Sequence, residues 1–586
     1  MTDVKAAPSR RRLLVVAIVA LAVVILVAAA WVGIRALLAK SELEAAAPLV
    51  DDIRTSALEG DLEEVTSRIA AVENHASSAA SLTDDPVWRA AESLPWLGSN
   101  LAAVRVVSSE LDHVASTLPP LVASLSAIAD GDAEAVIDVA ALAAAAPPLR
   151  EAAESLATAA ERLASLDTSS LLPAVAEGAE KMRQATDVLA PAVASAADVA
   201  ATLPPTLGSD GPRTILLTLQ NTAELRTGGG ITGTFVELRA EEGRLTLVRQ
   251  ADSSSFDSRA TSIAPVPDST TTVYSNGVGR YVQNTSMAPD FGTTAELASA
   301  WWRELTGSVA DTVVSVDPFV LEALVRVVGP VSIAGGGEIH ADDLIETLLV
   351  DSYRDLDQDQ QSALFATAVD AVFSRVSQGG LDPLALIRAM SEPVSEGRIS
   401  AWSVHDDEND VFRAGQLGGP VARQDLAGDG AFAVYFNDAT GGKLAPYLDV
   451  SLSASIVDCR SDGLVDVAVT IAASSTAPAD LGSMPFSVTG GGHFGIRPGD
   501  IAVDVAVSAP RDAFVGAVTV GGAKYPAPAA TVDEHPSTAA RVELAPGETK
   551  ELEYRFTVRA EDAAALQLLH TPLMSEPEIS VSTGCA

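Results

Sequence analysis

The sequence predicts a multi-domain protein with an N-terminal transmembrane helix, an all-α helical stalk, a central α/β domain and a C-terminal all-β sandwich. Three observations predict this order. An apolar run opens the chain, an alanine-rich region with helical spacing follows it, and β-rich apolar runs begin beyond residue 206. A chain of 586 residues is also too long to fold around one hydrophobic core, so several domains are expected.

The apolar run at residues 13–34 is long enough to cross a hydrocarbon core of ~30 Å at ~1.5 Å per residue. Residues 1–12 form the predicted cytoplasmic tail, because Lys5 and the arginines at 10–12 precede the run. A cleaved secretory signal is the alternative, since the alanines at 28–30 resemble its cleavage site, but its apolar region would be shorter. We therefore expect a single-pass plasma-membrane protein whose bulk lies outside the cytoplasm.

The segment before residue 41 is basic, and the rest of the chain is strongly acidic. Six of the 38 basic residues and one of the 78 acidic residues lie before residue 41, so the rest carries 32 basic and 77 acidic groups and a net charge of −45. Such a surface repels nucleic acid, and we expect no nucleic-acid partner. The seven histidines are scattered singly, which argues against a zinc site.

Residues 41–205 are rich in alanine and are predicted to form a bundle of antiparallel helices. Apolar residues recur there at steps of three and four: Leu62, Val65, Ile69 and Val72. Proline pairs at 119–120, 147–148 and 204–205 are expected to separate the helices. The predicted role of the bundle is a stalk that holds the next domain away from the membrane.

Residues 206–440 alternate strands with helices, which predicts an α/β domain. The predicted strands are 214–219, 233–238, 245–248, 312–316, 331–333, 398–404 and 431–436. Helices are expected to begin near residues 293, 317, 341, 358 and 383. The polar run at 253–276 is long enough to be a flap or a binding loop over a site.

From residue 446 to residue 586 the pattern is all β. Short runs, one of them at 486–488, are separated by Gly, Pro, Asp and Ser, and this spacing is typical of an immunoglobulin-like sandwich. The only two cysteines, Cys459 and Cys585, both fall here. We expect them to form a disulfide in an exported domain, and two unpaired buried thiols are the alternative.

Polar residues gather around a glycine loop where the first predicted strand and a later hairpin strand end. The polar residues are Asn221, Glu224, Arg226, Arg249 and Asp252, and the glycine loop is Gly228, Gly229 and Gly230. Glycines expose backbone N–H groups, so a loop of this kind with arginines nearby suits an anion such as phosphate. A hairpin loop closed by ordinary surface charges is the alternative interpretation.

Four separated stretches carry a resemblance to a known family. They are DDPVWRAAESLPWLGSNL at 84–101, LLTLQNTAELRTGGGITGTF at 216–235, MAPDFGTTAELASAWW at 287–302 and FNDATGGKLAPYLDVSLS at 436–453. Together they resemble the signature of a bacterial membrane family, the domain of unknown function numbered 4012. The resemblance spans most of the chain, and the family name implies no chemistry.

The runs TILLTLQN at 214–221 and LTLVRQADSSS at 245–255 are similar, more distantly, to the opening strands of LytR–CpsA–Psr domains. Those enzymes transfer a phosphate-linked glycopolymer from a polyprenyl pyrophosphate carrier to peptidoglycan, with arginines on the pyrophosphate and carboxylates on Mg²⁺. The resemblance implies Arg226, Arg249 and Asp252 as catalytic residues, Asp252 as the magnesium ligand, and Arg354 as the nearest candidate for a helix arginine. The family's Gly-Arg-Ser-Asp-Thr element is here GITGT at 230–234, without the arginine and the aspartate.

Two functions follow from these patterns. In the first, a cell-envelope protein binds a polyprenyl-linked phosphorylated glycan and transfers it to the cell wall. Asn221, Glu224 and the glycine loop contact the ligand in this hypothesis. In the second, the chain is a non-catalytic envelope scaffold that binds a glycan or a protein, and Asn221, Glu224 and Arg226 form a buried polar network that fixes the loop.

Overall fold

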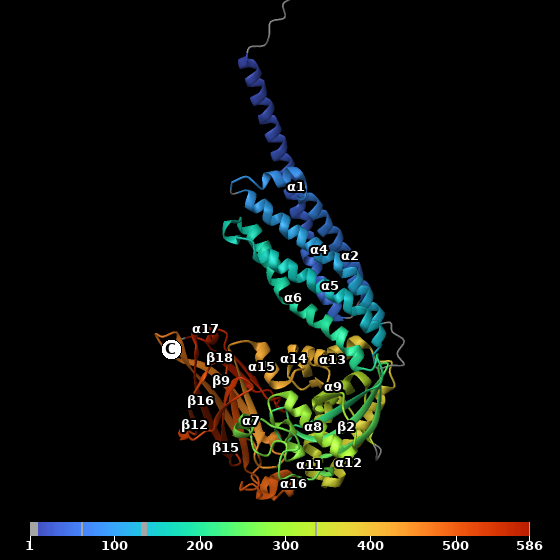
Figure 1. Cartoon of the computed structure of the whole chain (residues 1–586), viewed down its shortest axis with the longest axis vertical. Coiled ribbons are helices and arrows are strands. Elements are labelled where there is room, and N and C mark those ends of the chain that lie inside the picture. Colours follow the sequence, from blue (N-terminus) through green and yellow to red (C-terminus); the bar gives the residue numbers. More distant parts are fainter. Residues whose placement is uncertain (1–9, 60–61, 96, 130–136, 334–336, 585–586) are drawn as a thin grey trace, which may run out of the picture. The chain divides into compact units, whose positions relative to one another are not determined.

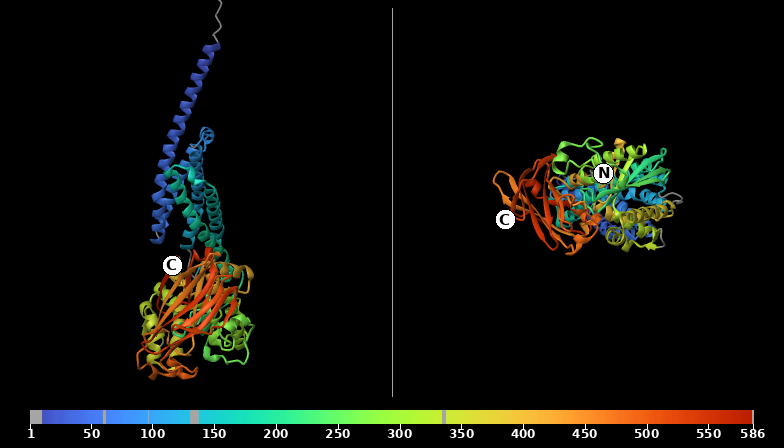
Figure 2. Two further views of the ribbon diagram at one scale, coloured as in Figure 1. Left: turned by 90° about the vertical axis from the view of Figure 1, so that its left-hand side faces the viewer. Right: turned by 90° about the horizontal axis from the view of Figure 1, so that it is seen from below.

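The computed structural model describes the chain except residues 1–9, 60–61, 96, 130–136, 334–336 and 585–586. The chain forms two compact units, one made of residues 1–131 and 140–201 and the other of residues 132–139 and 202–586. The first unit is helical, and the second contains sheets with helices packed around them (Figures 1 and 2).

Apart from the six-residue α3, the helices up to residue 206 are long, as the alanine-rich sequence predicts. They are α1 Arg10–Glu59, α2 Leu62–Thr83, α3 Pro86–Ala91, α4 Gly98–Ala129, α5 Val139–Ala164 and α6 Pro173–Thr206. The proline pairs at 119–120 and 147–148 lie inside α4 and α5, so the prediction that they separate helices is wrong. Proline's fixed φ is close to the helical value, so a helix packed against its neighbours can continue through it at the cost of hydrogen bonds.

Helix α1 contains the predicted apolar segment. Its residues 14–50 are long and apolar enough to cross a membrane, and α6 passes the same test of length and composition. The side chains at 14–27 of α1 are all exposed. An exposed, purely apolar surface of this length suits lipid rather than water. The apolar helix is therefore confirmed, while its orientation remains a prediction.

The α/β part of the second unit is built on a five-stranded mixed sheet of order β3-β2-β1-β4-β7. Its strands are β1 Arg213–Asn221, β2 Ile231–Glu241, β3 Arg244–Asp252, β4 Thr312–Val316 and β7 Ser400–Ser403. Strand β1 pairs parallel with β4, and the other neighbours are antiparallel. The strands at 214–219, 233–238, 245–248 and 312–316 are confirmed.

Helices cover both faces of this sheet because side chains alternate along each strand. Leu217 and Leu219 pack on one face with α9 Pro318–Val328 and α12 Gln358–Ser377. Leu216 packs on the other face with α8 Phe291–Thr306. The remaining elements of this part are α7 Asp268–Val273, β5 Val331–Ile333, β6 Gly337–Ile339, α10 Ala341–Glu346, α11 Ser352–Asp355, α13 Pro383–Ser395, α14 Asp406–Ala414 and α15 Gly419–Ala427.

The C-terminal region is β-rich and has two sheets, of order β13-β12-β16-β10-β9-β18 and β14-β15-β11-β8-β17. The strands are β8 Ala431–Asp438, β9 Leu448–Cys459, β10 Leu464–Ser475, β11 Ile501–Ser508, β12 Phe514–Val520, β13 Ala523–Tyr525, β14 Ala529–Val532, β15 His535–Leu544, β16 Thr549–Arg559, β17 Gln567–His570 and β18 Glu578–Ser582. The sheets face each other through Phe432 and Phe556, whose ring centroids lie 5.3 Å apart.

Two sequence predictions about this region are wrong. The strand at 431–436 was expected in the α/β domain, but as β8 it pairs with β11, because Phe432, Val434 and Phe436 face the core between the two β sheets. Residues 486–489 form a helical turn, α16, between Pro485 and Gly490 instead of a strand. Both flanking residues favour helix ends over strand interiors.

Cys459 lies at the end of β9 and is disulfide-bonded. Cys585, its predicted partner, lies outside the described residues. The pairing of these two cysteines therefore stays a prediction.

Candidate functional site

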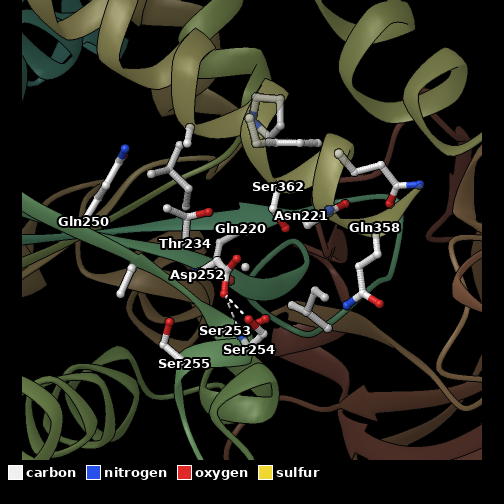
Figure 3. A pocket seen from close by; sticks show the side chains of 18 of the residues that line it. Gln220, Asn221, Thr234, Gln250, Asp252, Ser253, Ser254, Ser255, Gln358 and Ser362 are labelled. Atoms are coloured by element: carbon white, nitrogen blue, oxygen red, sulfur yellow. Dashed lines mark hydrogen bonds between the residues drawn. The ribbon is translucent and has the colours of Figure 1, made fainter. Parts of the chain in front are cut away.

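A cavity of about 410 Å³ opens where β1 and β3 end beside α12 (Figure 3). Strand β1 contributes Leu219 and Asn221, and β3 contributes Gln250 and Asp252. One side of the cavity comes from α12, on which Gln358, Ser362 and Phe365 follow at helical spacing. The cavity thus forms at strand ends, where ligands commonly bind in α/β sheets.

Neutral polar groups dominate the wall. The amide and hydroxyl side chains in the wall belong to Gln220, Asn221, Thr234, Gln250, Ser253, Ser254, Ser255, Tyr353, Gln358, Gln361 and Ser362. Apolar surface comes from Leu219, Ile231, Pro318, Leu321, Phe365 and two alanines. Among the described residues that line the cavity, Asp252 is the one carboxylate and Lys443 the one cation. A wall of this kind offers many uncharged hydrogen-bonding groups and an aromatic ring.

Two wall residues hold each other in place. The Asn221 amide donates to the Tyr353 hydroxyl, and the Asn221 side-chain oxygen accepts a hydrogen bond of 3.1 Å from the backbone N–H of Ala223. Burial raises the pKa of Tyr353, so its hydroxyl stays protonated at neutral pH. The predicted ligand-binding residue Asn221 therefore lies in the cavity wall with a fixed orientation.

Asp252 lies in the wall but already has a structural task. Its Oδ1 accepts a hydrogen bond of 2.9 Å from the Ser254 backbone N–H and one of 2.5 Å from the Ser254 hydroxyl, which caps a short 3₁₀ turn (Figure 3). The described residues contain no group of three His, Cys, Asp or Glu that could hold a metal. A single carboxylate that caps a turn does not fit the donor set of a dedicated Mg²⁺ site, so no step is assigned to Mg²⁺.

Arg249 lies on the opposite face of the sheet from Asp252. The two residues are three apart on one strand, and side chains alternate between faces with a period of two. Arg249 pairs across the strands with Glu237, and its Nε lies 3.6 Å from a Glu237 carboxylate oxygen. The same carboxylate accepts a 2.7 Å hydrogen bond from the indole N–H of Trp302, which belongs to α8. Arg249 does not line the cavity.

Arg226 is buried in a network of polar groups and does not line the cavity either. Its guanidinium donates 3.0 Å to the Asn284 side chain, 2.7 Å to the carbonyl of Leu225 and 3.1 Å to Glu224. Every one of these partners lies outside the cavity wall. The expectation that Arg226 and Arg249 converge on one ligand is therefore wrong.

Glu224 is the centre of this buried network. Its carboxylate pairs with Arg226 and with Lys443, which follows β8. Although burial raises it, these two cations hold the pKa of Glu224 below its ordinary value. Nearby, burial and then the charge of Glu224 raise the pKa of Asp438 to about 6. Glu224 thus acts as a structural ion, as the scaffold hypothesis expects.

Residues 210–353 match the family model described as Protein of unknown function (DUF4012). No curated protein matches the chain. A crystal structure of a Legionella pneumophila protein provisionally named as nutrient binding shares 7% identity with a TM-score of 0.14, and the match covers 22% of this chain and 43% of that one. At that level of similarity it bears on neither fold nor function.

The DUF4012 match contains the glycine loop and ends at Tyr353. Gly229 has φ +114°, a conformation that favours glycine. A Cβ on Gly230 would lie 2.2 Å from the Asn221 carbonyl oxygen, so the loop needs glycine for close backbone packing. Neither glycine lines the cavity. The loop therefore shapes β1 and β2 rather than cradling a ligand.

Arg354 follows the DUF4012 match immediately and is exposed. Its guanidinium pairs with Asp351, just before α11, and with Asp355, the last residue of α11, and Arg354 does not line the cavity.

Sequence reasoning missed Tyr353, Gln358, Ser362, Phe365 and Lys443, which all line the cavity. For α12 a signal existed, because Gln358, Ser362 and Phe365 lie on one face at steps of four and three.

Proposed function

We propose that this chain is a membrane-anchored cell-envelope protein whose α/β part binds a glycan in the cavity between β1, β3 and α12. The observation that carries the proposal is the cavity wall, which combines eleven amide and hydroxyl side chains with the ring of Phe365. Sugars present many hydroxyl groups and apolar C–H faces, which such a wall can match with hydrogen bonds and with a ring.

We propose binding rather than transfer as the activity. The transfer that LytR–CpsA–Psr phosphotransferases perform needs several cations on a pyrophosphate. In this cavity the one lining cation, Lys443, is already paired with Glu224. A polyprenyl phosphate attached to the glycan would therefore gain little from the wall, and the sugar part would supply the affinity.

The experiment is calorimetric titration of the full chain in detergent with neutral oligosaccharides of N-acetylglucosamine and with the same sugars carrying a 1-phosphate. Gln358→Ala and Ser362→Ala are expected to weaken both ligands to a similar extent. Asp359→Ala is the matched control, because Asp359 is an exposed neighbour on α12 that does not line the cavity. Failure of every sugar to bind, or equal affinity of all three variants and the parent, would sink the proposal.

A further inference from the structure

The connection between α2 and α4 lies against α1 at the end of its apolar part. It contains α3, whose Trp88 is fully buried with Val32 of α1 and Leu101 of α4. The Trp88 indole N–H donates a 3.2 Å hydrogen bond to the Leu101 carbonyl. This packing fixes the connection to α1 as one rigid piece of the helical unit.

Polar contacts fix the same junction. Asp85, the N-cap of α3, accepts a 3.2 Å hydrogen bond from the Trp31 indole N–H and pairs with Arg35 at 3.1 Å. Arg35 also donates to the carbonyls of Ser81 and Leu82, both at 3.0 Å. These contacts therefore fix the position of the whole connection along α1, at the level of Trp31.

Trp31 stands at the expected far surface of a bilayer. Arg11 and Trp31 are separated along α1 by about 30 Å at ~1.5 Å per residue, which is the thickness of a hydrocarbon core. Tryptophan and arginine side chains are the residues that settle at such interfaces. In Figure 1 the light-blue connection lies beside α1 at the level where the free part of that helix ends.

Apolar side chains of the connection and of α1 are exposed at this level. Trp31, Val87, Leu94 and Leu97 are 47%, 38%, 50% and 42% exposed, and we call these four residues the interfacial patch. Beside Leu94 and Leu97, the Gly98 backbone N–H donates a 3.0 Å hydrogen bond to the Leu94 carbonyl. Large apolar side chains that are exposed together mark a contact with a partner or a membrane.

The charges around the interfacial patch are paired. Arg89 pairs with Asp84, Arg105 with Glu92, and Arg35 with Asp85. The charges of Asp84, Glu92 and Asp85 are therefore compensated. These three acids do not give the patch the strong negative charge that the chain beyond residue 40 carries. A neutral apolar surface can enter the headgroup region without electrostatic repulsion.

We propose that the interfacial patch is a second membrane contact, which lies in the headgroup region of the bilayer that α1 spans. It rests on the membrane anchor in the proposed function. Two contacts, the span and the patch, hold the helical unit at a fixed tilt, which a single span does not do. The lipid bilayer is the occupant because the patch is continuous with the lipid-facing surface of α1.

The test uses the full chain in phosphatidylcholine vesicles with an environment-sensitive fluorophore on a single introduced cysteine. Leu94→Cys reports the patch, and Leu21→Cys reports the span. Ser116→Cys is the matched control, exposed on α4 about 27 Å beyond Gly98 at ~1.5 Å per residue. The parent chain, taken through the same labelling reaction, gives the background. Quenching is measured with lipids that carry a nitroxide near the headgroup or at the chain end.

The expected result is that the label at 94 loses most of its emission to the headgroup nitroxide, while the label at 116 keeps its emission. The label at 21 should be quenched by the chain-end nitroxide. Quenching at 21 without quenching at 94 overturns the patch and leaves the anchor standing. Absence of quenching at 21 overturns the anchor and the patch together. Crosslinking of label position 94 to a second copy, without lipid quenching, identifies a protein interface and also overturns the proposal.

Discussion

Glu224 and Lys443 form a part-buried ion pair that joins the loop after β1 to the loop after β8, 219 residues later in the chain. Arg226 pairs with the other oxygen of the same carboxylate at 3.1 Å. One carboxylate therefore compensates the buried Arg226 and the partly exposed Lys443, and through them it connects the α/β sheet to the first strand of the β-rich region.

Replacing Glu224 by Gln is expected to lower the free energy of unfolding by about 3 kcal/mol, because the buried Arg226 and the partly exposed Lys443 then lose their shared counter-charge. The double variant Glu224→Gln/Lys443→Met should lose less than the sum of the single variants, because it removes one of those cations. Hydrogen exchange at residues 438–443 measures the effect. Glu241→Gln, which breaks an exposed pair with Arg239, is the control and should leave exchange unchanged.

The pKa of Asp438 makes stability depend on pH in the same network. Burial, followed by the charge of Glu224, raises this pKa to about 6, so the folded protein favours the neutral acid. The stabilisation is full below about pH 4, the ordinary range of an aspartate, and is lost as the pH rises through 6. Asp438→Asn keeps the neutral form. It should match the parent at pH 4 and exceed it at pH 7 by at most about 3 kcal/mol.

Thermal unfolding of the parent and of Asp438→Asn at several pH values between 4 and 7 measures this difference. Asp480→Asn, at an exposed carboxylate, is the comparison and should follow the parent throughout. A difference between Asp438→Asn and the parent that does not change with pH would show that the carboxyl does not titrate in this range.

The network also shows which parts of the molecule the sequence could predict. The strand at 312–316 and the helix that begins with Asp317-Pro318 follow from local apolar runs and capping residues. The burial of Arg226 was one of two alternatives, and the sequence could not decide between them, because the partners Asn284 and Asp438 come from distant parts of the chain. The strand at 431–436 forms as predicted, but its assignment to the α/β domain was wrong for the same reason, since only its pairing with β11 shows which sheet it belongs to.

Gly230→Ala is expected to destabilise the loop by about 3 kcal/mol or more, because the new methyl group meets the backbone of Asn221 and Thr222 at 2.2–2.6 Å. Backbone atoms cannot move aside as a flexible side chain can. Gly233→Ala is the matched control on the next strand, where a Cβ finds its nearest neighbour at 3.6 Å, an ordinary contact. Melting temperatures of the two variants should differ clearly, and equal values would contradict the role assigned to Gly230.

Tyr353→Phe is expected to weaken glycan binding about five- to tenfold, because the Asn221 amide loses the hydroxyl that fixes it in the wall. Ring packing is kept, so the free energy of unfolding should change by no more than about 1.5 kcal/mol. Calorimetric titration and urea unfolding on the same samples separate the two effects. A loss of binding that merely follows a large loss of stability would contradict a role in the wall.

Arg249 and Gln250 are neighbours on β3 and point to opposite faces of the sheet, a consequence of strand geometry that the sequence alone already contained. Gln250→Ala removes a hydrogen-bonding group from the wall and should weaken glycan binding about five- to tenfold. Arg249→Ala should leave affinity unchanged, because the Arg249 side chain is 46% exposed beside Glu237 on the α8 face, and should cost no more than about 1 kcal/mol of stability. Titration of both variants with the phosphorylated and the neutral sugar shows which face of the sheet binds the ligand. If Arg249→Ala weakens binding of the phosphorylated sugar alone, the phosphate hypothesis is restored, and the phosphate then binds on the Arg249 face of the sheet and not in the cavity.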